Sequence, residues 1–258
     1  MNGASRLKRH PIAMAGRLRH SLVLAYALPS RALAALVPPG LELDTYGDSA
    51  FVAIAVVKVE RLRQSGLPER LGRDHLLTGY RVFVRQRLGT GRWRRGLHVL
   101  RTDADGRLLV AAGNLLTRYN FRFAGIRWLQ TGDRLEVRVE TRDRQADLHV
   151  IADLGSRPAP LPLGSPFTST AAARRFAGPL PWTFDLEPPT GSLVMVHGRR
   201  GGWEPRSVAV AVRTCTAFEG FLAGSLGGAE PRLANAFHVG DVDYRWERGV
   251  LMPPGVAW

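Results

Sequence analysis

Apolar and charged side chains alternate with a period of two residues through much of this sequence. In the segment 134–142, Leu135, Val137 and Val139 occupy every second position, and arginine or glutamate fills the positions between them. Successive side chains of a strand point to opposite faces, so this pattern predicts a strand with one buried face. Alternation and short apolar runs predict further strands at 21–27, 50–61, 77–88, 96–101, 108–112, 148–153, 192–198, 207–216 and 237–246.

Helices are expected to be few and short. Ser30 is a suitable N-cap for the first, and Ser169 or Thr170 for the second, because a hydroxyl accepts a hydrogen bond from a free backbone N–H group. Strands do not alternate regularly with helices, so the fold class is mainly β: an antiparallel barrel, cone or sandwich with two or three short helices. The expected helices cover 31–37, 171–177 and 217–226, and 102–106 is expected to be a hairpin turn.

The length of 258 residues is enough to bury a core without disulfides or structural metals. Cys215 is the only cysteine, which excludes a disulfide framework and a zinc site built from several cysteines. The proline- and glycine-rich segment 155–166 is the best candidate for a domain boundary. We interpret it as a loop that crosses within a single domain over 1–258, with the boundary as the alternative.

The formal net charge of +14 comes almost entirely from arginine, because Lys8 and Lys58 are the only lysines among 36 basic residues. A basic surface attracts nucleic acid, anionic lipid or acidic metabolites. The arginines are spread along the chain, which favours a compositional habit over a nucleic-acid site. The apolar run 22–37 is interrupted by proline and arginine and is short for a bilayer, so we expect no membrane contact and a cytoplasmic location.

The histidines and the cysteine give no strong signal of a metal or nucleophile. No histidine pair has the helical spacing of a zinc site, and we expect neither a metal nor a cofactor. Cys215 falls in an apolar segment, which is typical of a buried, inert thiol. The segment 118–128 mixes arginines with aromatic residues and has three interpretations: a core strand, the wall of a small-molecule pocket, or a stacking surface for single-stranded nucleic acid. In the strand interpretation, Tyr119, Phe121 and Phe123 point inward.

Several short stretches resemble, in order, the YqjF-like family of unknown function, which is similar in turn to acetoacetate decarboxylases. Residues 28–44 read as a proline, a short helix and then Val-Pro-Pro-Gly-Leu-Glu-Leu-Asp. Residues 50–54 (Ala-Phe-Val-Ala-Ile), 81–84 (Arg-Val-Phe-Val) and 96–104 (Gly-Leu-His-Val-Leu-Arg-Thr-Asp-Ala) resemble its next strands. The likeness covers about 18–142 and implies a cone-like antiparallel β-barrel, of the acetoacetate-decarboxylase kind, around a small-molecule pocket.

The resemblance also implies a test of mechanism. The decarboxylases form a Schiff base between a lysine and a β-keto acid, and that chemistry needs a nucleophilic amine. The corresponding stretch here, 112–124, holds no lysine, and arginine does not replace it because its guanidinium stays protonated. We therefore expect no Schiff-base chemistry. The glutamate and asparagine that the family carries before Arg81 are also lost, whereas Arg81 is retained.

These observations favour a protein that binds a small anionic organic molecule in the barrel. Whether it is an enzyme stays open; a lyase- or hydrolase-like reaction on a small carboxylate is the form expected if it is one. Polar residues of the matched strands are the candidate site: His98 as acid or base, Arg81 and Arg122 to hold the anion, and Asn114 and Tyr119 to orient it. For Arg81, an ion pair on a strand face is the alternative.

Two other classes of function stay open. A basic module for nucleic acid or another polyanion would present one contiguous arginine face. A non-catalytic accessory protein would fill its barrel with side chains and leave no cavity above roughly 300 Å³. A homo-oligomer is compatible with many strands, because an exposed strand edge can pair with a second copy.

Overall fold

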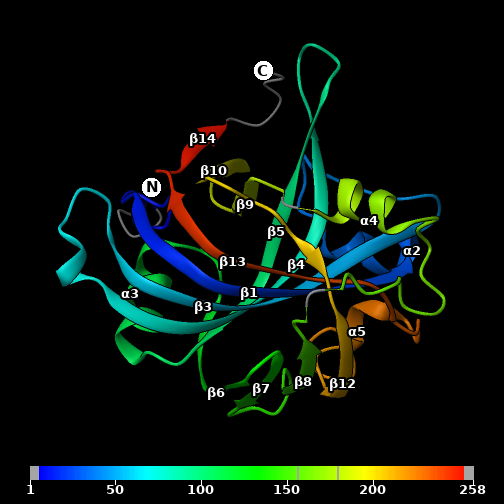
Figure 1. Ribbon diagram of the computed structural model, residues 1–258. Helices are drawn as coiled ribbons and strands as arrows, with labels where there is room; N and C mark the ends of the chain where they lie inside the picture. The colour runs from blue at the N-terminus through cyan, green and yellow to red at the C-terminus, as the bar shows by residue number, and fades with distance from the viewer. Residues whose placement is uncertain (1–5, 156, 179, 253–258) are drawn as a thin grey trace.

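The computed structural model describes residues 6–155, 157–178 and 180–252, and strands dominate it (Figure 1). The strands are β1 (Met14–Pro29), β2 (Glu42–Leu43), β3 (Ser49–Gln64), β4 (Arg73–Arg87), β5 (Trp93–Ala104), β6 (Phe121–Thr131), β7 (Arg134–Thr141), β8 (Leu148–Asp153), β9 (Trp182–Glu187), β10 (Ser192–Arg200), β11 (Arg206–Ser207), β12 (Ala209–Cys215), β13 (Arg232–Trp246) and β14 (Val250–Met252). The helices are α2 (Ser30–Leu33), α3 (Arg107–Leu116), α4 (Thr170–Ala177) and α5 (Ala223–Leu226), with 3-10 turns at Ala34–Leu36 and Glu69–Leu71.

The strand pairings of the described residues return to their starting point. The order β5–β9–β10–β13–β1–β3–β4 closes because β4 also pairs with β5. Every neighbour in this ring is antiparallel except β9, which runs parallel to β5. Closure removes the free edges that an open sheet would expose. The expected mainly β, cone-like antiparallel architecture is confirmed.

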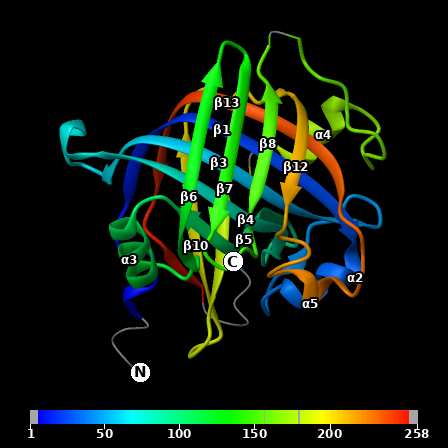
Figure 2. The same ribbon diagram turned by 90° about the horizontal axis from the view of Figure 1, so that it is seen from below.

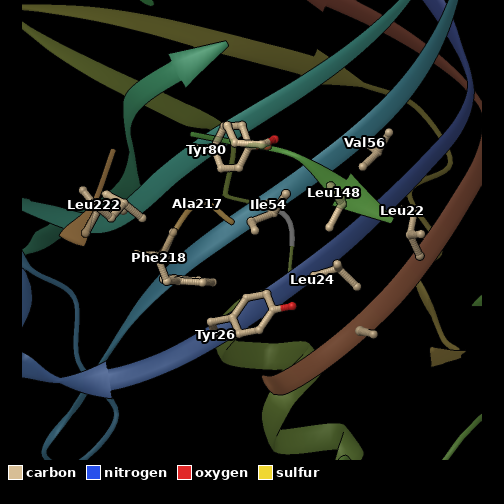
Figure 3. Close-up of a cluster of buried hydrophobic side chains, with 14 of the residues drawn as sticks. Leu22, Leu24, Tyr26, Ile54, Val56, Tyr80, Leu148, Ala217, Phe218 and Leu222 are labelled. Carbon is tan, nitrogen blue, oxygen red and sulfur yellow. The ribbon is translucent and has the colours of Figure 1, made fainter. Parts of the chain in front are cut away.

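A second layer covers one outer side of the ring. Strand β6 leaves the end of β5 in parallel and continues into the antiparallel order β6–β7–β8–β12. Figure 2 shows these four strands lying across β13, β1 and β3. The main core lies between the two layers, and Figure 3 shows part of it. It contains Leu22, Leu24, Ile54, Val56 and Tyr80 of the ring, packed with Leu148, Ala217, Phe218 and Leu222.

The opposite face of the same ring strands points inward, because alternate residues of a strand face opposite sides. Near one end, this inner face is filled by aromatic rings from the strands (Phe51 and Phe83), from α4 (Phe176) and from the segment before α4 (Phe167). Further along, Ala53 and Ala55 of β3 and Gly79 of β4 occupy inward positions. Because these residues are small, space remains inside the ring. The outer face therefore builds the core, and the inner face builds a cavity.

The expected strand at 108–112 is wrong, because these residues belong to helix α3. The expected hairpin turn at 102–106 is also absent: 102–104 continue β5, and α3 follows. The short apolar run was interpreted as a strand, but its apolar residues also recur at helical spacing. Leu109, Ala112, Gly113 and Leu116 recur at steps of three and four residues, and all four line the cavity. A short apolar run without polar alternation does not distinguish helix from strand.

The expected capping of α4 is confirmed, since the Ser169 side chain accepts a hydrogen bond from the backbone N–H of Ala172 at 3.1 Å. The third expected helix is much shorter than 217–226. The inward orientation expected for Phe123 is wrong, and this ring is 44% exposed. Strand β6 leaves the ring at this point and buries Ala124 and Ile126 against the outer core instead, so its buried face changes.

The segment 155–166 connects β8 with α4; its residue 156 lies outside the described residues. The Ser165 hydroxyl donates to the backbone carbonyl of Ala234 at 2.7 Å, and the backbone N–H of Ala159 donates to Ser207 at 3.1 Å. These contacts attach the segment to β13 and β11, which come much later in the chain.

Candidate functional site

The ring of strands encloses a mostly apolar cavity of about 260 Å³. This volume lies below the roughly 300 Å³ that would separate a ligand pocket from a side-chain-filled barrel, so size alone favours the alternative of a non-catalytic accessory protein. The chemistry of the wall is more informative, because a few polar groups converge on an apolar space. These polar groups are His10, Ser21, Arg81, Thr102, Thr117, Tyr119, Thr183, Arg200, Tyr244 and Glu247.

Arg81 is the central polar group of the cavity, and strand geometry places it there. Residues 77, 79, 81 and 83 of β4 share the inward face. The cross-strand partners on β3 are alanines: Ala55 opposite Gly79 and Ala53 opposite Arg81. These small residues leave room for the long side chain, whose accessible surface faces the cavity.

The Arg81 guanidinium lacks the partner that a buried charge normally has. Its Nε is buried without a hydrogen bond, and it forms no ion pair with any carboxylate of the described residues. Burial lowers the pKa of Arg81, yet an arginine remains protonated at physiological pH. The alternative of a strand-face ion pair is therefore wrong. A desolvated cation without a counter-charge costs folding free energy, and its N–H donors form a strong binding site for an anion.

Two phenols lie near this charge. The Tyr119 hydroxyl lies 2.6 Å from the Thr183 hydroxyl, and burial raises the pKa of Tyr119 well above its usual value. Burial also raises the pKa of Tyr244, while the positive charges of Arg200 and Arg81 oppose that increase. Both phenols are therefore protonated at neutral pH and can donate hydrogen bonds to an anion held by Arg81.

His10 enters the cavity from the segment before β1. Burial lowers its pKa to about 4, its Nε2 has no hydrogen-bond partner in the described structure, and its ring lies 4.4 Å from that of Tyr119. The segment is fixed by its neighbours: the His10 backbone N–H donates to Leu116, and Arg9 forms an ion pair of 2.7 Å with buried Glu187. A neutral imidazole of this kind can accept a proton.

The structure brings together only two of the five expected site residues, Arg81 and Tyr119. His98 points away from the cavity, because its neighbours Leu97 and Val99 occupy the inward positions; its Nδ1 lies 3.0 Å from the Phe184 carbonyl. This corrects the expectation that His98 faces the ligand. Alternation on the strand had two possible phases, and the sequence did not fix which one faces inward.

Asn114 and Arg122 are corrected in the same way. The Asn114 amide donates to the Phe121 carbonyl at 2.8 Å and accepts from the Phe121 N–H at 2.9 Å, so it joins α3 to β6. Arg122 is exposed and pairs with Asp143. His10, Tyr244 and Arg200 also line the cavity and were not among the expected site residues. They come from segments far from β4 in the chain, so no local sequence pattern pointed to them.

No lysine lines the cavity in the described structure. The backbone carbonyl of Lys8 accepts a bond from Arg118, and Lys58 lies on the outer face of β3 opposite His20. The described residues also hold no group of three or more histidine, cysteine or carboxylate side chains suited to a metal. Burial raises the pKa of the Cys215 thiol to about 11, which makes it a poor nucleophile.

The closed ring, its covering sheet and its interior cavity define the class: an acetoacetate-decarboxylase-like β fold. The acetoacetate decarboxylase of Legionella pneumophila superimposes with a TM-score of 0.64 at 13% identity, over 93% of this chain and 86% of that one. The enduracididine biosynthesis enzyme MppR, solved with pyruvate, gives a TM-score of 0.56 at 14% identity, over 93% and 90%. An acetoacetate decarboxylase-like enzyme from Sphingomonas wittichii RW1 gives 0.56 at 12%, over 94% and 93%. At such identities the likeness concerns the fold.

The chain belongs to the DUF2071 family, described as an uncharacterized conserved protein, whose model matches residues 15–177. It is also 28% identical over 141 residues to the uncharacterized protein YqjF of Bacillus subtilis (strain 168). That match covers 53% of this chain, and the chain spans about half the length of this relative (52%). The expected family resemblance is confirmed. No helix in the described part of the chain is long and apolar enough to cross a membrane.

Proposed function

We propose that this protein binds a small organic acid inside the ring, with the carboxylate on Arg81 and the apolar part of the molecule against the surrounding wall. The observation that carries the proposal is the half-buried Arg81 guanidinium, whose buried Nε has no hydrogen-bond partner and which faces an apolar cavity without an acidic partner. A carboxylate would supply the missing counter-charge and accept paired N–H bonds in the fixed geometry of the guanidinium.

The rest of the wall supports a molecule with a short apolar body. Alanine, valine, leucine and phenylalanine side chains form most of it, and the volume of about 260 Å³ admits only a small ligand. Tyr119 and Tyr244 donate to the anion, and Thr102 and Ser21 add hydroxyls on the wall. MppR, one of the structural neighbours, has been solved with the small acid pyruvate, which agrees with a ligand of this class.

A reaction on the bound acid is a further part of the proposal. His10 takes the role of base earlier given to His98, because it lies in the cavity and its imidazole is neutral at physiological pH. We expect no Schiff-base decarboxylation, since none of the described residues that line the cavity offers an amine. We also propose a cytoplasmic location, with which the single cysteine is compatible.

Calorimetric titration with hexanoate and its neutral isostere hexanamide tests the binding proposal. The wild-type protein should bind hexanoate about 10- to 100-fold more tightly than hexanamide, the effect of a charge-assisted hydrogen bond. Arg81→Gln should remove this preference. Arg127→Gln, which removes an exposed charge of β6 that pairs with Glu140 of β7, should leave this preference unchanged. Equal affinity of the wild-type protein for acid and amide, or no binding of either, would overturn the proposal.

A further inference from the structure

A second hollow, of about 410 Å³, opens at the end of the ring where three strand ends meet. Met14 pairs with Gln64 on one side and with Trp246 on the other, so the start of β1 lies beside the ends of β3 and β13 (Figure 1). We call this hollow the arginine cleft. Its lining is Ala15, Gly16, Arg17, Arg61, Arg63, Glu69, Arg199, Arg200, Gly201, Asp243, Tyr244 and Arg245.

The arginine cleft carries an excess of positive charge. Six arginines and only two carboxylates line it. Arg61 and Arg63 share Glu69, and Arg199 and Arg245 share Glu247, which lies outside the lining. Because one carboxylate balances only one of two guanidiniums, each of these two groups retains a net positive charge. Arg17 is balanced by Asp241 and Asp243, so the excess charge comes from the other arginines.

The arginine cleft borders the interior cavity, and two residues line both spaces. Arg200 and Tyr244 are cross-strand partners on β10 and β13. The Tyr244 ring lies across the backbone of Gly198, where a Cβ would come within 1.9 Å of its hydroxyl oxygen. The charges of Arg200 and Arg81 both act on this hydroxyl. Tyr244 therefore stands between the guanidinium inside the ring and those outside it.

We infer that the ligand has two anionic ends: a carboxylate held by Arg81 in the cavity and a phosphate group held in the arginine cleft. This inference rests on the proposed function, whose cavity supplies the first end. A phosphate suits the cleft because its oxygens accept hydrogen bonds from several guanidiniums at once, whereas a carboxylate engages one fork. The ligand class is a phosphorylated small organic acid whose apolar middle passes Tyr244.

Three probes separate the two ends in calorimetric titrations: hexanoate for the cavity, inorganic pyrophosphate for the cleft, and phosphonohexanoate for both. Wild-type protein should bind phosphonohexanoate at least about tenfold more tightly than hexanoate, the contribution of one additional charge-assisted contact. The double variant Arg61→Gln/Arg245→Gln should lose this gain and bind pyrophosphate more weakly, with hexanoate affinity unchanged. In it, Glu69 keeps Arg63 and Glu247 keeps Arg199, so no carboxylate is left unpaired.

The matched control is Arg127→Gln/Arg138→Gln, which removes two charges from the covering sheet and should behave as wild type. Hexanoate that binds as tightly as phosphonohexanoate would overturn the two-ended ligand while the proposed function stands. If the wild-type protein does not bind hexanoate at all, both the proposed function and the two-ended ligand are overturned. A single-stranded oligonucleotide that binds more tightly than phosphonohexanoate through Arg61 and Arg245 would also overturn the inference, in favour of a polyanion surface.

Discussion

Gly79 and Arg81 lie two residues apart on the inward face of β4, and the guanidinium of Arg81 folds back over the Gly79 backbone. A Cβ at position 79 would lie 2.9 Å from Nη2 and 3.0 Å from Nε of Arg81. Only a residue without a side chain leaves this space free. The glycine therefore sets the position of the charge in the cavity, although it has no polar group of its own.

The variant Gly79→Ala should weaken carboxylate binding while the fold is retained. The added methyl group meets the far end of a flexible side chain, so Arg81 moves and the strand does not. We expect the hexanoate affinity to fall about fivefold, equivalent to about 1 kcal/mol. Gly125→Ala on β6 is the control, because the nearest atom to its Cβ is 3.8 Å away. Equal affinities of the two variants in calorimetry would contradict the assigned role of Gly79.

Arg101 and Arg81 should respond oppositely to the same substitution. Arg101 is 1% exposed and pairs with Asp103 at 2.9 Å and Asp143 at 3.0 Å, so Arg101→Met should destabilise the protein by about 3–5 kcal/mol. Arg81 has no such partner, and Arg81→Met should stabilise it by about 1–3 kcal/mol while abolishing acid binding. Urea denaturation of both variants measures the contrast. A marked loss of stability in Arg81→Met would mean that its charge is compensated in the native state.

Asp185 should make the protein less stable as the pH rises. Burial raises its pKa to about 7, and its Oδ2 has no hydrogen-bond partner in the described structure. A carboxyl with a raised pKa holds its proton in the folded state, so stability falls as the pH rises from about 4 to about 7 and then levels. Asp185→Asn keeps an Oδ1 acceptor for the Leu186 N–H.

The gain in unfolding free energy of Asp185→Asn over wild type should grow from near zero at pH 4 to about 2–4 kcal/mol above pH 7. The comparison cancels the opposite contribution of His10 and His238, whose lowered pKa values favour the folded state at higher pH. Denaturation curves at four pH values between 4 and 8.5 measure the difference. A gain that stays constant across this range would show that the carboxyl is ionised throughout.

Treatment with sodium cyanoborohydride in the presence of pyruvate or acetoacetate should trap no adduct that depends on the cavity. An iminium forms only on an amine, and neither Lys8 nor Lys58 lines the cavity. Mass spectrometry of proteolytic peptides assigns any trapped adduct to its amine. An adduct at Lys58 or Lys8 that a competing hexanoate suppresses would contradict the prediction.

Much of the local structure followed from the sequence alone. The alternation at 134–142 predicted strand β7 with Leu135, Val137 and Val139 buried, and the structure confirms it. Ser169 marked the start of α4 because its hydroxyl has a local partner three residues on. The lack of lysine in the segment 112–124 was equally visible, since it depends on composition and not on geometry. The alternation of side chains, the capping residue and the composition of a segment are local properties, so they can be read from the order of the residues.

The site depended on the tertiary structure. Alternation showed that Arg81 and His98 lie on strands, but only closure of the ring decided that Arg81 faces the cavity and His98 does not. Helix α3 formed where a strand was expected, because its apolar residues recur at helical spacing and the helix buries them against the cavity. His10 and Tyr244 come from opposite ends of the chain and meet Arg81 only when β13 pairs with β1 and closes the ring. Long-range pairing places these groups, and no local pattern encodes it.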